Sequence, residues 1–370
     1  MTGSRSAALV GALAAAVGIG ACTSTHVARA PLPVPLVIGH RGAPGHLPEH
    51  TLASYRLAIE LGADCIEPDL VATRDGALVA RHEPNLEGST DVAARPEFAD
   101  RYRAAHPVDG VPQAGWFASD FTLAELRTLR ARQAFPEHRF TGADGRLGVP
   151  TLEEVIELAR TASAEVGRTI CLYPELKHPS YHRELGLPLE RAVVEVLGRH
   201  GFRTRDAAVF LQSFEPTSLV RLDRLTGLRL VQLVAGGGVT ADGSVTVTPP
   251  YDRPYDWVRS GRADTYAHLV SPAGLDEVAG YADGIGVWKP YLLRAGPDGA
   301  PRSTGLVEAA RARGLVVHAW TFRSEARWLP PGVGAPADEI RLFYEAGVDG
   351  VFADFPGAAV AARTQFRLGR

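Results

Sequence analysis

Eight short apolar runs recur along this chain, and the sequence between them is helical or forms a long crossover. The predicted strands lie at 36–39, 65–71, 169–176, 208–213, 228–234, 283–288, 315–320 and 350–353. Helices are expected near 52–61, 151–162, 186–199, 215–225, 303–313 and 337–346. Alternation of this kind favours a parallel sheet in an α/β fold. Eight such units favour a closed (β/α)8 barrel of the TIM type.

Polar residues cluster where the predicted strands end, and in a barrel these ends form one mouth. The residues near such ends are His40, Arg41, Glu67, Asp69, Glu175, Lys177, Ser213, Trp320 and Asp354. A further strand at 78–82 follows the turn residues Asp75 and Gly76. This hairpin would bring His82 back over the mouth.

Three of these residues are carboxylates that we expect to converge. Glu67 and Asp69 are two apart in a strand and therefore face the same side, as do Glu175 and Lys177. Converging carboxylates repel unless a cation or Lys177 compensates them. Oxygen ligands suit Ca²⁺ or Mg²⁺, with Ca²⁺ favoured here. The alternative is an ion-pair network in the barrel interior, but the neighbouring histidines and Arg41 favour the metal site.

The histidines and Arg41 add acid–base chemistry to this mouth. His40 and His82 each lie beside charged residues, and Arg41 is suited to clamp an anion. Together they indicate metal-assisted attack on a phosphate ester. His46 and His50 stand beside a helix start, where we expect exposure. His318 is two residues before Trp320 and is expected to fill the interior.

Composition and the N-terminal sequence indicate the class of protein, its partners and its cellular location. The chain is 45% hydrophobic and 22% charged with a net charge of -3, which is typical of a soluble globular protein and argues against nucleic acid as a partner. Arg5, the apolar run at 7–21 and Ile19-Gly20-Ala21-Cys22 resemble a lipoprotein signal peptide. We therefore expect a signal at 1–21, a lipidated Cys22, a tether at 22–35 and an extracytoplasmic protein anchored to the membrane in the periplasm or cell envelope.

The barrel is expected to span 36–365, with insertions near 84–150 and 236–281 over its mouth. A capping box at Thr122 predicts a helix inside the first insertion, and another at Thr151 opens the next barrel helix. Cys65 and Cys171 both lie within apolar runs, which favours two buried free thiols over a disulfide.

These motifs resemble the glycerophosphodiester phosphodiesterase family, in its longer, periplasmic branch. The resemblance runs through His40-Arg41-Gly42-Ala43, Leu47-Pro48-Glu49-His50-Thr51, Glu67-Pro68-Asp69, His82-Glu83, Glu175-Leu176-Lys177, Gln212-Ser213-Phe214, Trp320-Thr321 and Asp354-Phe355-Pro356. It covers about residues 36 to 357, nearly the whole of the expected mature chain. Two residues depart from the family: His50 replaces a usual Asn, and Glu83 an Asp that is often found there.

The resemblance implies a (β/α)8 barrel and hydrolysis of a glycerophosphodiester to sn-glycerol 3-phosphate and an alcohol such as choline or ethanolamine. It makes His40 and His82 the acid/base pair. Arg41, Lys177 and Trp320 become substrate or phosphate contacts, and Glu67, Asp69 and Glu175 become ligands of a divalent cation. The sequence leaves open which histidine is the acid, which alcohol is preferred and what the oligomeric state is.

Two other functions fit the same residues. One is a phospholipase D-like or lysophospholipase D-like barrel that acts on lipids, with the insertions deciding how open the mouth is. The other is a non-catalytic lipoprotein that captures phosphodiesters, for which the cation and Arg41 would suffice.

Overall fold

The computed structural model describes residues 1–3, 35–240, 242–296, 299–330 and 333–369. Residues 4–21 of the predicted signal peptide, Cys22 and the tether up to residue 34 lie outside these ranges. The chain divides into two units, Met1–Pro31 and Leu32–Arg370, and the fold below is that of the second. Within the described ranges, no helix is both long enough and apolar enough to cross a bilayer.

Eight parallel strand positions form the centre of the fold, as predicted. They are β1 (Leu36–His40), β2 with β3 (Cys65–Glu67 and Asp69–Ala72), β7 with β8 (Cys171–Leu172 and Glu175–Leu176), β9 (Phe210–Ser213), β10 (Arg229–Val234), β13 (Gly284–Trp288), β16 (Val316–Phe322) and β17 (Gly350–Ala353). Two positions are split in the middle, one of them at Pro68, which has no N–H to donate to the ladder.

Pairing along the strands closes the ring. β1 pairs with β17 on one side and with β2 on the other, and β2 pairs in parallel with β7. β3 pairs with β8, which leads through β9, β10, β13 and β16 back to β17. The predicted (β/α)8 barrel is confirmed, and the carboxyl ends of all eight strands meet at one mouth.

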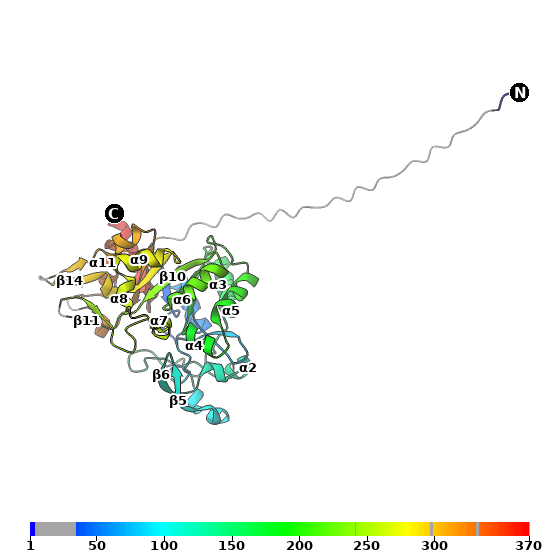
Figure 1. Ribbon diagram of the computed structural model, residues 1–370, viewed down its shortest axis with the longest axis horizontal. Coiled ribbons are helices and arrows are strands. Elements are labelled where there is room, and N and C mark those ends of the chain that lie inside the picture. The colour runs from blue at the N-terminus through cyan, green and yellow to red at the C-terminus, as the bar shows by residue number, and fades with distance from the viewer. Residues whose placement is uncertain (4–34, 241, 297–298, 331–332, 370) are drawn as a thin grey trace. The chain divides into compact units, whose positions relative to one another are not determined.

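Helices cover the outside of the barrel (Figure 1). They are α1 (Leu52–Glu60), α3 (Leu152–Val166), α5 (Leu189–Arg199), α6 (Pro216–Leu225), α9 (Pro272–Ala279), α10 (Leu306–Arg311), α11 (Pro336–Glu345) and α12 (Pro356–Leu368). The capping box at Thr151 opens α3, and the one at Thr122 opens the short α2 (Leu123–Leu126), both as predicted. The C-terminal α12 was not predicted.

Segments between the barrel elements build a second layer over one part of the mouth. Residues 84–150 contain a hairpin of β5 (Arg103–Val108) and β6 (Val111–Gly115), drawn in cyan in Figure 1. They have a small core of their own that includes Phe98, Trp116 and Phe121 and packs on Val71 and Val79 of the barrel hairpin. This core fixes the segment against the strand that precedes His82.

The second expected insertion ends earlier than the sequence indicated. Residues 238–269 contain β11 (Gly238–Val239), β12 (Val245–Thr246), α7 (Tyr255–Ser260) and α8 (Tyr266–Leu269). The following helix, α9, lies between β10 and β13 in the chain and buries Leu275 and Val278 in the main core, so it belongs to the barrel. A third hairpin, β14 (Leu293–Ala295) with β15 (Pro301–Ser303), was not predicted.

The prediction of two free thiols is wrong. Cys65 and Cys171 form a disulfide in the barrel interior. They are register partners on the neighbouring strands β2 and β7, and their Cα atoms are 4.3 Å apart. Both side chains are fully buried, as expected from their apolar surroundings. The bond links the strand that carries Glu67 to the strand that carries Glu175.

Candidate active site

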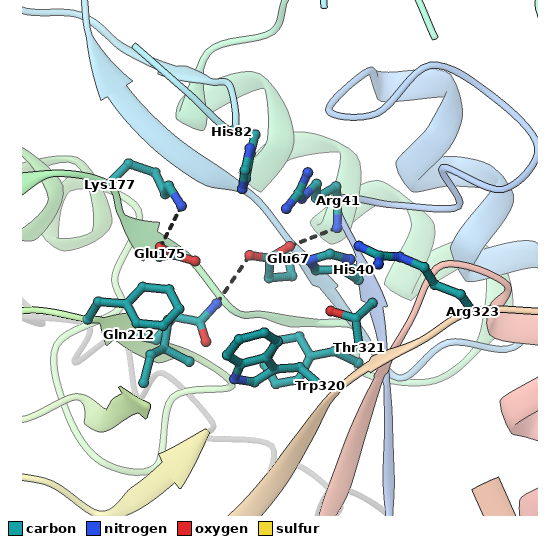
Figure 2. A pocket seen from close by; sticks show the side chains of 13 residues that line it. His40, Arg41, Glu67, His82, Glu175, Lys177, Gln212, Trp320, Thr321 and Arg323 are labelled. Carbon is teal, nitrogen blue, oxygen red and sulfur yellow. Dashed lines mark hydrogen bonds and ion pairs between the residues drawn. The ribbon is translucent and has the colours of Figure 1, made fainter. Parts of the chain in front are cut away.

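The mouth of the barrel contains a cavity of about 200 Å³, and Figure 2 shows its lining. Seven of the eight site residues predicted from the sequence line it, namely His40, Arg41, Glu67, His82, Glu175, Lys177 and Trp320. The eighth, Asp69, is 1% exposed and lies within 3.4 Å of the Arg41 guanidinium. The structure therefore brings the whole predicted set together.

The three carboxylates converge as their strand positions require. Glu67 ends β2 and Asp69 begins β3, while Glu175 begins β8 and is the register partner of Asp69. One oxygen from each carboxylate lies within 4.8 Å of the others. Their exposed fractions are only 1%, 1% and 6%. Like charges this close and this buried are unstable without compensation.

Neighbouring donors fix the orientation of this cluster. The backbone N–H of Arg41 donates to Glu67 Oε2 at 2.7 Å, and Gln212 Nε2 donates to Glu67 Oε1 at 3.1 Å. Lys177 Nζ lies 3.1 Å from Glu175 Oε1. Glu67 and Glu175 are thus held in place by neighbouring donors.

The pKa values of the cluster reflect this crowding. Burial, together with the charges of Asp69 and Glu175, raises the pKa of Glu67 well above its usual value. Burial also raises the pKa of Glu175, to about 8. Burial acts on Asp69 in the same direction, but Lys177 and His50 hold its pKa well below the ordinary range.

An oxygen-ligating dication fits these residues. Asp69 Oδ1 is buried and accepts no hydrogen bond from any described residue, so the cluster presents an acceptor without a donor there. Carboxylate oxygens are the ligands that Ca²⁺ and Mg²⁺ prefer. Glu67, Asp69 and Glu175 would hold the ion, and its charge would relieve their repulsion.

Arg41 and Lys177 place two positive charges beside the acidic cluster. Arg41 Nη1 contacts Glu49 at 3.1 Å, and its Nε lies 3.4 Å from Asp69 Oδ2. Burial disfavours the charge on Lys177, but Glu175 and Asp69 hold its pKa above the usual value. Both side chains also line the cavity, where they can meet an anion.

His40 is fixed by a carboxylate at the end of the next strand. Its Nδ1 donates to Asp354 Oδ1 at 2.6 Å, because β1 and β17 are paired neighbours. Asp354 Oδ2 accepts from Arg139 Nη2 at 2.5 Å and from Arg323 Nε at 3.1 Å. The arrangement leaves Nε2 of His40 for chemistry. Burial and Arg41 lower the pKa of His40.

His82 has a similar arrangement. Its Nδ1 lies 3.1 Å from Glu83 Oε1, which leaves Nε2 available. Burial, Arg41 and Lys177 lower its pKa well below the usual value. In Figure 2 the His82 ring points toward Glu67 and His40. Two imidazoles therefore approach one small space beside the acidic cluster.

His50 corrects an expectation. We expected exposure, but the side chain is fully buried. Its Nε2 lies 2.9 Å from Asp69 Oδ2, and its Nδ1 lies 2.7 Å from the hydroxyl oxygen of Tyr55. A left-handed backbone, with φ of 55°, turns the chain at His50 before α1 begins. Proximity to a helix start did not reveal this turn.

Sequence reasoning also missed three supporting residues. Gln212 holds Glu67, and Arg139 and Arg323 hold Asp354. Neighbouring residues in a strand face opposite sides, so alternation along β9 could have separated Gln212 from Ser213. Gln212 reaches Glu67, whereas the hydroxyl of Ser213 donates to the backbone carbonyl of Leu176. Arg139 comes from the segment that precedes α3, and the sequence carried no signal for its position.

A second cavity, of about 190 Å³, adjoins the first. It shares Glu175, Lys177 and Phe214 with the first cavity. The rest of its lining is largely aromatic or polar and includes Asp109, His178, Glu215, Tyr251, Arg253, Tyr255 and Tyr266. A ligand held at Glu175 and Lys177 can therefore extend into either cavity.

A model of the glycerophosphoryl diester phosphodiesterase family matches residues 40–358, which includes every residue of this site. The chain belongs to this family. Membership makes it a phosphoric diester hydrolase.

Similar proteins agree with the assignment. A glycerophosphodiester phosphodiesterase of Arabidopsis thaliana is 34% identical over 349 residues, covering 90% of this chain and 87% of its own. One from Haemophilus influenzae is 31% identical over 348 residues and covers 88% of each chain. These relatives span nearly the full barrel and its inserted segments.

Solved structures share the fold. A glycerophosphoryl diester phosphodiesterase structure from Silicibacter pomeroyi superimposes with a TM-score of 0.59 at 22% identity, covering 92% of this chain and 96% of that chain. An Oleispira antarctica phosphodiesterase, solved with its product sn-glycerol-3-phosphate, gives 0.58 at 21% identity, with 90% and 97% covered.

Proposed function

We propose that this enzyme cleaves glycerophosphodiesters with a divalent cation held by Glu67, Asp69 and Glu175 and with His40 and His82 as the acid/base pair. The observation that carries the proposal is the buried acidic cluster, whose oxygens approach within 4.8 Å beside two histidines. A hard dication in this position would polarise a phosphoryl oxygen and attract the substrate phosphate.

Arg41, Lys177 and the two histidines would supply the remaining catalytic interactions. Arg41 and Lys177 lie at the cavity and offset charge that grows on the phosphate during attack. One histidine takes, through its Nε2, the proton of the attacking water or glycerol 2-hydroxyl. Attack by the 2-hydroxyl would give a cyclic phosphodiester, which a water then opens to glycerol phosphate. The other histidine gives a proton to the leaving alkoxide. The carboxylates at their Nδ1 atoms stabilise the protonated rings.

The products follow from the related proteins. The relatives named above are glycerophosphodiester phosphodiesterases, and the Oleispira enzyme was solved with sn-glycerol-3-phosphate. We propose sn-glycerol 3-phosphate and an alcohol as the products here. Trp320 forms part of the cavity wall and would contact the substrate.

The second cavity suits a short alcohol better than a long acyl chain. Its volume is about 190 Å³, and its lining combines phenols, carboxylates and Arg253 with the apolar side chains of Leu176, Pro179, Ala235 and Pro250. A phospholipase D-like or lysophospholipase D-like activity would need a longer apolar groove. Binding without catalysis would need neither histidine, yet His40 Nδ1 is hydrogen-bonded to Asp354, His82 Nδ1 lies beside Glu83, and both rings line the cavity.

We also propose that the protein is an extracytoplasmic lipoprotein. The support is the apolar run at 7–21 followed by Ile19-Gly20-Ala21-Cys22. A lipidated Cys22 would join the barrel to the membrane through the tether at 22–35. With its diacyl or triacyl chains, such an anchor holds firmly, because two or more chains add their membrane affinities.

The proposed activity is tested by release of glycerol 3-phosphate from a panel of substrates. Glycerophosphocholine, glycerophosphoethanolamine and lysophosphatidylcholine are compared, each with and without chelator. We expect turnover of the first two, little turnover of the lipid, and loss of all activity with chelator. Preferred turnover of lysophosphatidylcholine would support the lipid-directed alternative, and binding without turnover would support the capture protein.

A further inference from the structure

Contacts at His82 continue beyond the cavity. Glu83 uses both of its oxygens: Oε1 lies 3.1 Å from His82 Nδ1, and Oε2 lies 3.2 Å from His178 Nε2. The other ring nitrogen of His178, Nδ1, lies 2.6 Å from Asp109 Oδ2. Asp109 lies in the turn between β5 and β6, so a chain of four side chains joins this hairpin to His82.

The backbone is left-handed at two of these residues, Asp109 and His178. Among the described non-glycine residues, positive φ occurs at Arg41, His50, Asp109 and His178. Arg41 and His50 contact the acidic cluster directly. The other two, with φ of 49° and 46°, are the partners of the 2.6 Å contact. The two-residue hairpin turn Asp109-Gly110 itself requires a positive φ at Asp109. The left-handed backbone of His178 has no such origin, and conformations of this kind concentrate at functional sites.

The charges alternate along this series of linked side chains. Burial disfavours the charged form of His178, but Asp109 and Glu83 raise its pKa to about 10. A cation therefore lies between two carboxylates at neutral pH. His178 and His82 in turn hold the pKa of Glu83 below its usual value, against the effect of burial. An ionised Glu83 thus lies beside His82.

The hairpin does not need Asp109 to remain docked. His106 Nε2 lies 3.0 Å from the hydroxyl of Tyr181 on α4 (Pro179–Glu184), and Val108, Phe117 and Tyr181 form a small buried cluster. These contacts already fasten the hairpin to the barrel. A carboxylate at the hairpin turn is therefore available for a role other than docking.

We propose that Asp109, His178 and Glu83 are positioning residues that orient His82 and keep its Nδ1 protonated, so that the β5–β6 hairpin is a working part of the active site. This inference rests on the proposed function, in which His82 is an acid or base. It adds three residues that act through His82 and do not touch the phosphate.

Removal of the Asp109 charge should change the pKa of His82. Arg41 and Lys177 lower the pKa of His82, whereas Glu83 and Asp69 raise it. Glu49 also faces this histidine. Loss of the Asp109 charge leaves the cation at His178 less compensated. The pKa of His82 should therefore fall further.

The test is Asp109→Asn, because Asn keeps the shape and tolerates a left-handed backbone. Asp100→Asn is the matched control. Asp100 is exposed in the same inserted segment and is not one of the four side chains that link Asp109 to His82. The Cε1–H resonance of His82 is identified by its loss in His82→Gln and is titrated by NMR in each variant. Steady-state kinetics and thermal unfolding are measured on the same samples.

We expect Asp109→Asn to lower kcat by about tenfold with little change in KM, as for loss of a group that orients a functional histidine. The pKa of His82 should fall, while Asp100→Asn matches the wild type. His178→Asn should lower kcat to a similar extent, but it removes the cation itself, so the pKa of His82 should rise. The kcat of the double variant should be no lower than that of either single variant.

An unchanged His82 titration and an unchanged kcat in both single variants would overturn the inference. The two proposals fail in different ways. Full activity of His82→Gln would refute the role of His82 in turnover. Inactive His82→Gln beside fully active, normally titrating Asp109→Asn would refute only the positioning chain.

Discussion

His40 Nδ1 lies 2.6 Å from Asp354 Oδ1, although 314 positions separate the two residues in the sequence. The first and last strands of the barrel, β1 and β17, are paired neighbours, so closure of the ring creates this contact. His82 shows the same relationship with Glu83. Both histidines thus have Nδ1 beside a carboxylate and Nε2 free to transfer a proton.

Asp354→Asn tests the first of these contacts. An amide can accept from His40 but provides no charge to stabilise the protonated ring. We expect kcat to fall by about 10–100-fold, as for loss of a partner that orients a functional histidine. Steady-state kinetics of the single variants and of Asp354→Asn with His40→Ala measure the effect. Additive losses in the double variant would show that Asp354 does not act through His40.

The acid/base roles predict severe defects in two variants. His40→Ala and His82→Ala should each lower kcat by about 10²–10⁴-fold, the usual contribution of a general acid or base. The circular dichroism spectrum should remain that of the wild type. His46→Ala is the control, because His46 is exposed in the loop after His40. Near-normal turnover in either variant would remove that histidine from the mechanism.

Buried histidines predict a loss of stability at acid pH. His182 is fully buried, neither of its ring nitrogens has a hydrogen-bond partner among the residues that the structure describes, and burial lowers its pKa to about 3. Between about pH 3 and 6.5 the unfolded chain therefore binds a proton that the folded state does not, and the free energy of unfolding falls as pH is lowered through this window.

Denaturant unfolding of His182→Phe at several pH values measures this contribution. The slope of the free energy of unfolding against pH should decrease by up to about 1.4 kcal/mol per pH unit between pH 4 and 6. His138→Phe, at an exposed position, should keep the wild-type slope. Equal slopes in all three proteins would mean that His182 takes up a proton without unfolding.

The lipoprotein proposal is tested at Cys22. The wild-type chain should fractionate with membranes and carry lipid, because the anchor partitions into the bilayer. Cys22→Ala should release the protein into the soluble extracytoplasmic fraction with its phosphodiesterase activity intact. Equal membrane association of the two proteins would show that Cys22 is not the anchor.

Strand positions and their ends could be predicted from the sequence, because both depend on local patterns. Apolar runs gave the eight strands, and their polar ends gave His40, Glu67 and Glu175. Residue alternation placed Glu67 and Asp69 on the same side. Parallel strands then necessarily collect these residues at one mouth.

Long-range register and unusual backbone conformations could not be predicted in this way. The disulfide depends on Cys65 facing Cys171 across β2 and β7, which apolar runs do not specify. His50 turns inward through a positive φ that no neighbouring glycine or proline announces. The contact of Asp109 with His178 joins residues 69 positions apart through an inserted hairpin.

The central claim is that turnover depends on a cation held by Glu67, Asp69 and Glu175. The most direct measurement is glycerol 3-phosphate release after exhaustive chelation and during re-addition of Ca²⁺ or Mg²⁺, in the wild type and in Glu67→Gln. The account predicts no activity in the chelated enzyme, full recovery with cation in the wild type, and recovery of Glu67→Gln only at higher cation concentration, because one ligand charge is lost. Full activity of the chelated, metal-free enzyme, with Glu67→Gln impaired only in stability, would contradict it and leave an ion-pair network in place of the metal site.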